Sequence, residues 1–317
     1  MSLETIATLD LGNFLSTDKN IRDRFVKELG DSLKEFGFFA IGNHGVDQGL
    51  IEKNYALMQE FFELPVEVKK KYEIEGGGGQ RGYTSFGKEH AKDSKYPDLK
   101  EFWHVGREVP EGHALKKIYQ PNVWIKEIPE YEEAALELMN QLDRLAGLTL
   151  RALSLYLGEN EHTFDSMLEY GNSILRTIHY PEIPEGAHPQ SVRAGAHEDI
   201  NLITILCEST APGLELLRRD GTWLPIHAQK GFMVIDSGDM LARITNQVIP
   251  ATTHRVVNPG NSRERRFSMP YFVHPRPDAE LACLKSCISE GNPQKYPPIL
   301  ADDFLTERLI EIGLIKK

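Results

Sequence analysis

The sequence has few cysteines, no long apolar run and no excess of basic residues. Three cysteines occur in 317 residues, and an odd, sparse set does not build a disulfide framework. No stretch of about 18 apolar residues exists, the length that a membrane-spanning helix needs. Lysine and arginine number 36 against 47 acidic residues, so the net charge is −11. These absences argue against a disulfide-stabilised secreted domain, a membrane protein and a nucleic-acid-binding protein, which needs a basic face for phosphate contacts.

Targeting signals are also missing from the N-terminus. The opening residues Met-Ser-Leu-Glu-Thr lack the basic region and apolar run of a secretory signal peptide. We therefore expect a cytoplasmic protein with no membrane and no nucleic-acid partner. The hydrophobic fraction of 40% is ordinary for a globular protein with a sizeable core. The oligomeric state is left open by the sequence.

The first half of the chain shows mainly helical patterns. Apolar residues recur every three or four positions over 20–36, which predicts an amphipathic helix that Gly37 would end. Similar patterns predict helices at about 47–63, 130–157 and 301–315. Cys283 and Cys287 are four residues apart and would share one helical face as small apolar residues. The four glycines at 76–79 predict a mobile loop or hinge.

After about residue 172 the pattern changes to short apolar runs separated by turn signals such as Pro-Gly and Asp-Gly. Closely spaced short strands of this kind are typical of a β-sandwich or jelly roll. The runs occupy 174–178, 202–207, 214–217, 231–235, 254–257 and 267–274.

His197, Asp199 and His254 form a candidate metal site. On an extended strand, residues i and i+2 point the same way and lie roughly 6–7 Å apart, so His197 and Asp199 can approach one ion while Glu198 points away. His254 begins a strand-like run and can arrive from a neighbouring strand. Two imidazoles and one carboxylate are the ligands of non-heme Fe(II) sites with open coordination positions. The spacing alone is also compatible with a structural histidine.

Arg266 and Ser268 form a candidate carboxylate receptor. Strand alternation puts both on one face with Phe267 on the other, and a guanidinium fork binds both oxygens of a carboxylate. The 12-residue distance from His254 suggests a hairpin through 258–261. The alternative is a surface arginine beside Arg263 and Arg265.

Together these segments resemble the Fe(II)- and 2-oxoglutarate-dependent oxygenases of the isopenicillin N synthase-like branch. The match is specific as an ordered set, although each member alone is not. The matching segments are 35–46, 61–65, 80–83, 176–181, 196–204, 253–256 and 266–268.

The resemblance implies an α+β fold with a double-stranded β-helix, or jelly-roll, core flanked by N-terminal and C-terminal helices. It implies a single catalytic unit with a mainly helical region at 1–165, the oxygenase core at 166–280 and a helical extension at 281–317. The expected activity is a non-heme Fe(II) dioxygenase that couples oxidative decarboxylation of 2-oxoglutarate, with O2, to hydroxylation or related oxidation of a small molecule. Ascorbate is a possible stimulant.

The same resemblance assigns site residues. His197, Asp199 and His254 would be the iron ligands, and no catalytic residue beyond them is assigned. Arg266 and Ser268 would hold the distal carboxylate of 2-oxoglutarate, with Tyr180 nearby. Arg81 and Tyr83 are candidate substrate contacts, because this region borders the substrate pocket in relatives; the alternative is a solvated loop.

Some features depart from the family pattern or leave alternatives open. Many relatives carry Asn where this chain has Ile178, so one polar contact to the co-substrate is missing or replaced. Isopenicillin N synthase itself uses no 2-oxoglutarate, and its Arg-x-Ser pair holds a substrate carboxylate. An iron oxidase of that type, or a non-catalytic metal- and ligand-binding protein, therefore stays an alternative. The substrate and the position oxidised cannot be predicted from these residues.

Overall fold

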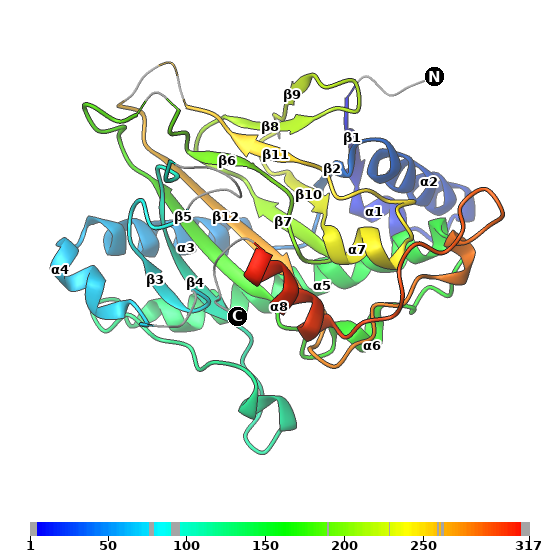
Figure 1. The fold of residues 1–317 in the computed structure, drawn as a ribbon, viewed down its shortest axis with the longest axis horizontal. Helices are drawn as coiled ribbons and strands as arrows, with labels where there is room; N and C mark the ends of the chain where they lie inside the picture. The colour runs from blue at the N-terminus through cyan, green and yellow to red at the C-terminus, as the bar shows by residue number, and fades with distance from the viewer. Residues whose placement is uncertain are drawn as a thin grey trace.

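Two β-sheets of eight and four strands form the centre of the molecule (Figure 1). The structure, a computed structural model, describes residues 5–75, 79–89, 96–188, 190–227, 229–258, 260 and 263–311. The larger sheet contains, in spatial order, β1 (Ala7–Asp10), β2 (Phe38–Gly42), β10 (Met233–Ser237), β7 (Ile203–Cys207), β12 (Arg266–Val273), β5 (Ile174–Tyr180), β4 (Glu101–Gly106) and β3 (Gly82–Thr84). The smaller sheet contains β6 (Ala194–His197), β11 (His254–Val256), β8 (Leu214–Leu217) and β9 (Trp223–Pro225).

The space between the two sheets is lined by alternate residues of their strands. Phe38 of β2, Val234 of β10 and Leu216 of β8 belong to one buried apolar cluster. Because β-strand side chains alternate between faces, the neighbours of these residues point to the opposite, outer face of each sheet. Two sheets packed with apolar inner faces are the expected jelly-roll core, so the predicted fold class is confirmed.

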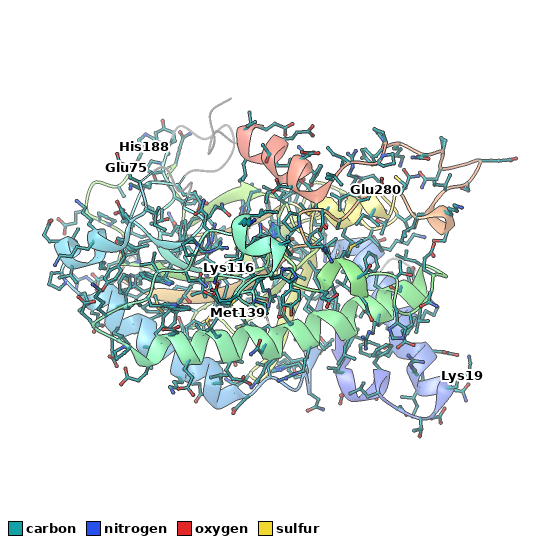
Figure 2. The ribbon with its side chains drawn as sticks, turned by 90° about the horizontal axis from the view of Figure 1, so that it is seen from below. Lys19, Glu75, Lys116, Met139, His188 and Glu280 are labelled. Carbon is teal, nitrogen blue, oxygen red and sulfur yellow. The ribbon has the colours of Figure 1, made fainter. Side chains whose placement is uncertain are left out.

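Helices cover the outer face of the larger sheet. Figure 2, where Met139 is labelled on α5, shows this helix lying lengthwise along the sheet. The helices are α1 (Leu11–Phe14), α2 (Lys19–Phe36), α3 (Gln48–Glu63), α4 (Val66–Lys69), α5 (Glu130–Tyr156), α6 (Asp165–Leu168), α7 (Asp239–Ile244) and α8 (Ala301–Glu311). Short 3₁₀ turns lie at η1 (Lys70–Tyr72), η2 (Ala114–Lys117) and η3 (Lys285–Cys287). Among the described residues, no helix combines the length and apolar character needed to traverse a lipid bilayer.

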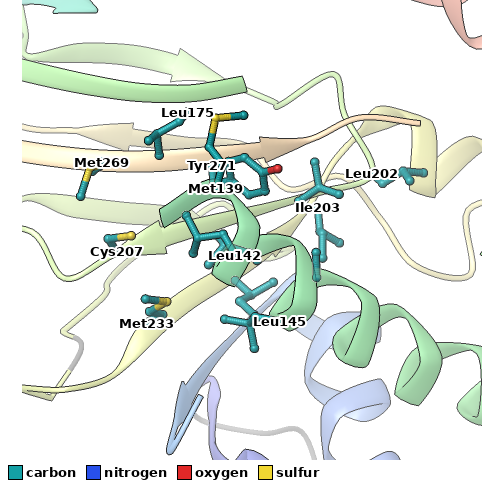
Figure 3. Packing of buried hydrophobic residues seen from close by; sticks show 14 of the residues in the cluster. Met139, Leu142, Leu145, Leu175, Leu202, Ile203, Cys207, Met233, Met269 and Tyr271 are labelled. Atoms are coloured by element: carbon teal, nitrogen blue, oxygen red, sulfur yellow. The ribbon is translucent and has the colours of Figure 1, made fainter. Parts of the chain in front are cut away.

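The main core lies between α5 and the larger sheet. Leu142 and Leu145 are buried against Ile203 of β7 and Met233 of β10 (Figure 3). Each fully buried side chain of this size stabilises the fold by about 1.5–3 kcal/mol. This contact fixes the larger sheet on one side and leaves its other face to line the space between the sheets.

The boundaries of α2 follow from its sequence. The side chain of Asp18 accepts a hydrogen bond from the backbone N–H of Asn20 at 2.8 Å and caps the first turn. Gly37 ends the helix with a positive φ of 68°, which a side chain would disfavour. The helix predicted at 20–36 is confirmed, as are those at about 47–63 and 130–157.

Gly30 permits the close approach of α2 to α5. A Cβ placed on Gly30 would lie 2.0 Å from ring atoms of Tyr156, whose hydroxyl donates to Asp31 at 3.0 Å. Gly30→Ala should therefore lower the free energy of unfolding by about 1–3 kcal/mol through overpacking. Gly147→Ala is the matched control, because nothing lies within 4 Å of that Cβ; it should raise the same quantity by about 0.5–1 kcal/mol. Urea denaturation of both variants tests this prediction. A Gly30→Ala protein as stable as the Gly147→Ala protein would contradict it.

Two local predictions are wrong. The segment after β11 does not form a hairpin, because β11 belongs to the smaller sheet and β12 to the larger one. Residues 259, 261 and 262 of this connection lie outside the described residues. Cys283 and Cys287 do not share a helical face, since only η3, a single 3₁₀ turn that ends at Cys287, occurs there.

The division of the chain into segments that end at residues 165 and 280 stays a prediction. Strands β1 to β4 come from the region before residue 165, yet they belong to the same sheet as β5, β7, β10 and β12. The C-terminal α8 packs through Phe304 and Leu309, and Arg308 lies 3.6 Å from Asp239 of α7. Of the glycine stretch at 76–79, residues 76–78 lie outside the described residues.

Candidate metal centre and carboxylate pocket

His197, Asp199 and His254 converge on one point. His254, the first residue of β11, is paired directly with His197, the last residue of β6, and their ring centroids are 4.5 Å apart. Asp199 Oδ1 lies 3.7 Å from His197 Nε2. One potential ligand atom from each of the three residues lies within 4.8 Å of the other two. This grouping is the arrangement that a single metal ion requires.

Asp199 lies in the irregular segment that follows β6, whereas its spacing from His197 had predicted a position on the strand itself. The strand β6 ends at His197, and the Asp199 carbonyl accepts a hydrogen bond from the backbone N–H of Asp239 at 2.8 Å. Gly238 makes this contact possible, because a Cβ there would lie 2.8 Å from the Asp199 carbonyl oxygen. The Thr204 hydroxyl of β7 donates to the Asp199 carboxylate and orients it.

The hydrogen bonds of both imidazoles leave one ring nitrogen free to bind a metal. Nδ1 of His197 lies 2.7 Å from the Gly195 carbonyl oxygen, and Nδ1 of His254 lies 3.2 Å from that of Thr252. Because a carbonyl oxygen only accepts, each Nδ1 must carry the proton, which leaves the Nε2 lone pair available. The tautomer that a metal needs is thus set by the backbone.

The charge states also suit a divalent cation. Burial, together with the neighbouring His197, lowers the pKa of His254 to about 4, so this ring is neutral near pH 7. Burial alone would raise the pKa of Asp199, but the adjacent His254 and His197 lower it below its usual value. A carboxylate and two imidazoles are the ligand set of an open non-heme iron site.

Arg266, Ser268 and Tyr180 lie together on the inner face of the larger sheet. Arg266 of β12 pairs with Tyr180 of β5, and Ser268 pairs with Ile178. The guanidinium carbon of Arg266 lies 5.0 Å from the centre of the Tyr180 ring. Arg266 is 1% exposed, and its Nε donates to the Ala211 carbonyl at 3.0 Å.

The Arg266 guanidinium has unsatisfied hydrogen-bonding capacity. Its Nη1 is buried and has no hydrogen-bond partner in the described part of the chain. A buried cationic donor without a partner is costly, so the residues present fit an anionic ligand here. Phe272, on the same face of β12, pairs with Thr204, the residue that bonds to Asp199. Arg266 and the threonine that orients Asp199 therefore lie on the same, inner face of the larger sheet.

Arg176 is a residue of this interior face that the sequence reasoning did not single out. It alternates with Ile178 and Tyr180 along β5, and strand parity could have identified it. Its guanidinium carbon lies 4.2 Å from the ring centre of Phe102 and 5.1 Å from that of Phe272. Its Nε donates to His104 Nε2.

Arg81 is buried, and its guanidinium is hydrogen-bonded to backbone carbonyl groups. It is 3% exposed and donates to the Gln80 carbonyl at 2.7 Å and to the Gln120 carbonyl at 3.2 Å. Its contact with substrate stays a prediction, and these bonds do not support it.

Tyr83 faces the helices on the outer side of the sheet. It pairs with Trp103 of β4, and its hydroxyl donates to Glu101. The Glu101 carboxylate also accepts from Lys69 Nζ at 2.8 Å. Among the described residues, no contact joins Tyr83 to the metal cluster, so its role in substrate binding stays a prediction without support.

Comparison with known proteins matches both halves of the chain. Residues 171–275 match the 2OG-Fe(II) oxygenase superfamily, and residues 6–127 match the non-haem dioxygenase in morphine synthesis N-terminal family. The 2-oxoglutarate-Fe(II) type oxidoreductase hxnY of Emericella nidulans is 30% identical over 94% of this chain and 87% of its own length.

Solved structures agree with this assignment. A protein of Caulobacter crescentus attributed to the 2OG-Fe(II) oxygenase family is 42% identical, covers 98% of this chain and 99% of that chain, and superposes with a TM-score of 0.88. A full-length protein of Neurospora crassa, solved in complex with alpha-KG and thymine, is 26% identical over 96% of each chain with a TM-score of 0.85.

The chain belongs to the 2OG-Fe(II) oxygenase superfamily. It is an oxidoreductase, an Fe(II)- and 2-oxoglutarate-dependent dioxygenase that uses O2. Its relatives are named as 2-oxoglutarate enzymes, which favours this reading over an oxidase that needs no keto acid.

Proposed function

We propose that His197, Asp199 and His254 are the three iron ligands. The convergence of their ligand atoms within 4.8 Å carries this proposal, and the Nδ1 hydrogen bonds and neutral His254 support it. Iron held by these three residues would supply the chemistry that oxidises the substrate with 2-oxoglutarate and O2. Thr204 orients the Asp199 carboxylate.

The distal carboxylate of 2-oxoglutarate is bound by Arg266 and Ser268, beside Tyr180. The buried, unpartnered Nη1 of Arg266 supports this role. Ser268 shares the face of Arg266 and offers a hydroxyl donor. Ile178, opposite Ser268, packs with Phe102 and Tyr180 in a small apolar cluster, so an apolar contact stands where many relatives have an asparagine.

The substrate is a small organic molecule that occupies the interior space next to the metal ligands. Phe102 and Phe272 offer ring faces there, and the guanidinium of Arg176 lies against both. Such a set suits a substrate with a planar or apolar part and a hydrogen-bond acceptor.

The three segments 1–165, 166–280 and 281–317 act as one catalytic unit, because strands of the first complete the sheet of the second.

Anaerobic titration tests this function. Protein loaded with Fe(II) should develop a visible metal-to-ligand charge-transfer band when 2-oxoglutarate is added. In air it should release succinate slowly without substrate and faster with one, and ascorbate should prolong the activity. Iron binding without any binding of 2-oxoglutarate would contradict the proposal in favour of an oxidase that takes all its electrons from the substrate. A screen of small molecules for succinate above the uncoupled background would then identify the substrate class.

A further inference from the structure

A second arginine, Arg193, lies beside the proposed carboxylate pocket. It comes directly before β6 and is 1% exposed. Its Nη2 donates to the carbonyl oxygen of Glu264, two residues before Arg266. The head group of Arg193 is thereby tied to the end of β12 from which Arg266 projects.

Both guanidinium groups lie close to the same aromatic ring. The guanidinium carbon of Arg193 is 5.8 Å from the centre of the Tyr180 ring, and that of Arg266 is 5.0 Å from it. Burial, followed by the positive charge of Arg266, lowers the pKa of Arg193. Two buried cations beside one aromatic ring are unfavourable unless an anion accepts hydrogen bonds from them.

The protein itself leaves several of these donors unused. Arg193 Nε and Nη1 and Arg266 Nη1 are buried without a hydrogen-bond partner in the portion of the chain that the structure describes. The neighbouring cation Lys100 differs, because its Nζ is bonded to Glu89 and Asp98, each at 2.8 Å. Glu89 and Asp98 are thus engaged by the lysine. The Glu264 carboxylate acts on Arg193 through its charge only, so the two arginines retain those unpartnered N–H groups.

We propose that Arg193 binds the distal carboxylate of 2-oxoglutarate together with Arg266, so that two guanidinium groups form the receptor. This inference rests on the proposed function, which assigns that carboxylate to Arg266. The distal carboxylate of a five-carbon keto acid would accept hydrogen bonds from the unpartnered N–H groups of both arginines. A keto acid of the same length without this carboxylate would leave them unsatisfied, so Arg193 adds selectivity for a dicarboxylate.

A pair of ligands that differ only in the distal group tests Arg193. We would measure the dissociation constants of 2-oxoglutarate and of 2-oxopentanoate, which lacks the distal carboxylate, for the Fe(II)-loaded protein under anaerobic conditions by calorimetry and by the visible band. In R193M, binding of 2-oxoglutarate should weaken about tenfold or more, as expected for losing a charge-assisted hydrogen bond. Binding of 2-oxopentanoate should change less than about twofold, because it has no group for Arg193 to contact.

Two further variants make the result specific. R193K keeps the charge but not the planar fork, so its effect on 2-oxoglutarate should be intermediate. R265M is the matched control: Arg265 directly precedes Arg266, its side chain is 39% exposed, and it bonds to His179 on the opposite face of the sheet. It should bind both keto acids as the wild type does. Thermal unfolding confirms that each variant is folded.

Each outcome decides one of the two proposals. Equal weakening of both keto acids in R193M, or unchanged binding of 2-oxoglutarate, would overturn the role of Arg193 and leave the proposed function intact. If the wild-type protein binds Fe(II) but neither keto acid, the proposed function itself fails, and the assignment of Arg193 fails with it.

Discussion

Asp199→Ala and His197→Ala proteins should lose turnover, with iron affinity and activity lowered by more than about a hundredfold. Groups that merely orient metal ligands contribute factors of about 10–100, so the loss of a ligand should exceed this range. The loss arises because two remaining donors hold ferrous iron poorly and in the wrong geometry. His254→Ala should behave in the same way, since its ring lies 4.5 Å from that of His197.

The fold should survive these substitutions. The three side chains lie between the sheets, whereas the main core is the apolar contact of α5 with the larger sheet. Asp199→Ala removes the acceptor of Thr204, which costs about 1 kcal/mol of stability. Iron binding by calorimetry, succinate release and thermal unfolding together separate a lost site from a lost fold.

Glu198→Gln is the matched control for the metal site. Glu198 stands between the two proposed ligands in sequence, but its carboxylate points outward and accepts from the Thr253 hydroxyl at 2.8 Å. This variant should retain iron binding and succinate release. Normal activity in His254→Ala, or equal damage by Glu198→Gln, would refute the ligand assignment.

Arg266→Ala should weaken the binding of 2-oxoglutarate by roughly a hundredfold or more while iron affinity stays near that of the wild type. Each charge-assisted hydrogen bond contributes about 1.5–3 kcal/mol, and a guanidinium fork makes two. The effect should exceed that of R193M, because Arg266 and Ser268 lie on one strand face and approach the carboxylate together. Ser268→Ala removes one neutral donor and should cost about tenfold or less.

Iron and keto acid must be titrated separately to test this prediction. Fe(II) binding to Arg266→Ala without 2-oxoglutarate should match the wild type, and the visible band should appear only at much higher 2-oxoglutarate concentration. If Fe(II) binding falls in parallel, Arg266 supports the fold of the site and not the co-substrate. R265M, whose side chain lies on the opposite sheet face, again provides the reference.

Local patterns predicted the secondary structure well where the signal lay within one element. The helix at 20–36 could be predicted because its apolar spacing and its terminal Gly agree, and the structure adds the Asp18 cap. Strand alternation correctly put Arg266 and Ser268 on one face. The strands β3 and β4 were not predicted, because each is completed by pairing with the next strand toward β5, and their sequences alone resemble a loop.

The connection after β11 shows where local patterns fail. Turn residues indicate that the chain changes direction, but they do not determine which sheet the next strand joins. Here β11 pairs with β6 and β8, whereas β12 pairs with β5 and β7. The predicted hairpin was wrong because strand partners are selected by the burial of whole sheet faces and not by the turn.

The sequence by itself determined the chemical types at the site: two histidines, an aspartate at spacing two, and an arginine with a serine on one strand face. These depend on short-range spacing and on residue chemistry, which do not need the fold. Only the tertiary structure decided which of the other polar groups share the interior. It placed Arg193 and Arg176 there and Tyr83 on the opposite face. Burial and the distances between residues remote in sequence decide which side chains share this interior. Neither is defined until the two sheets have packed against each other.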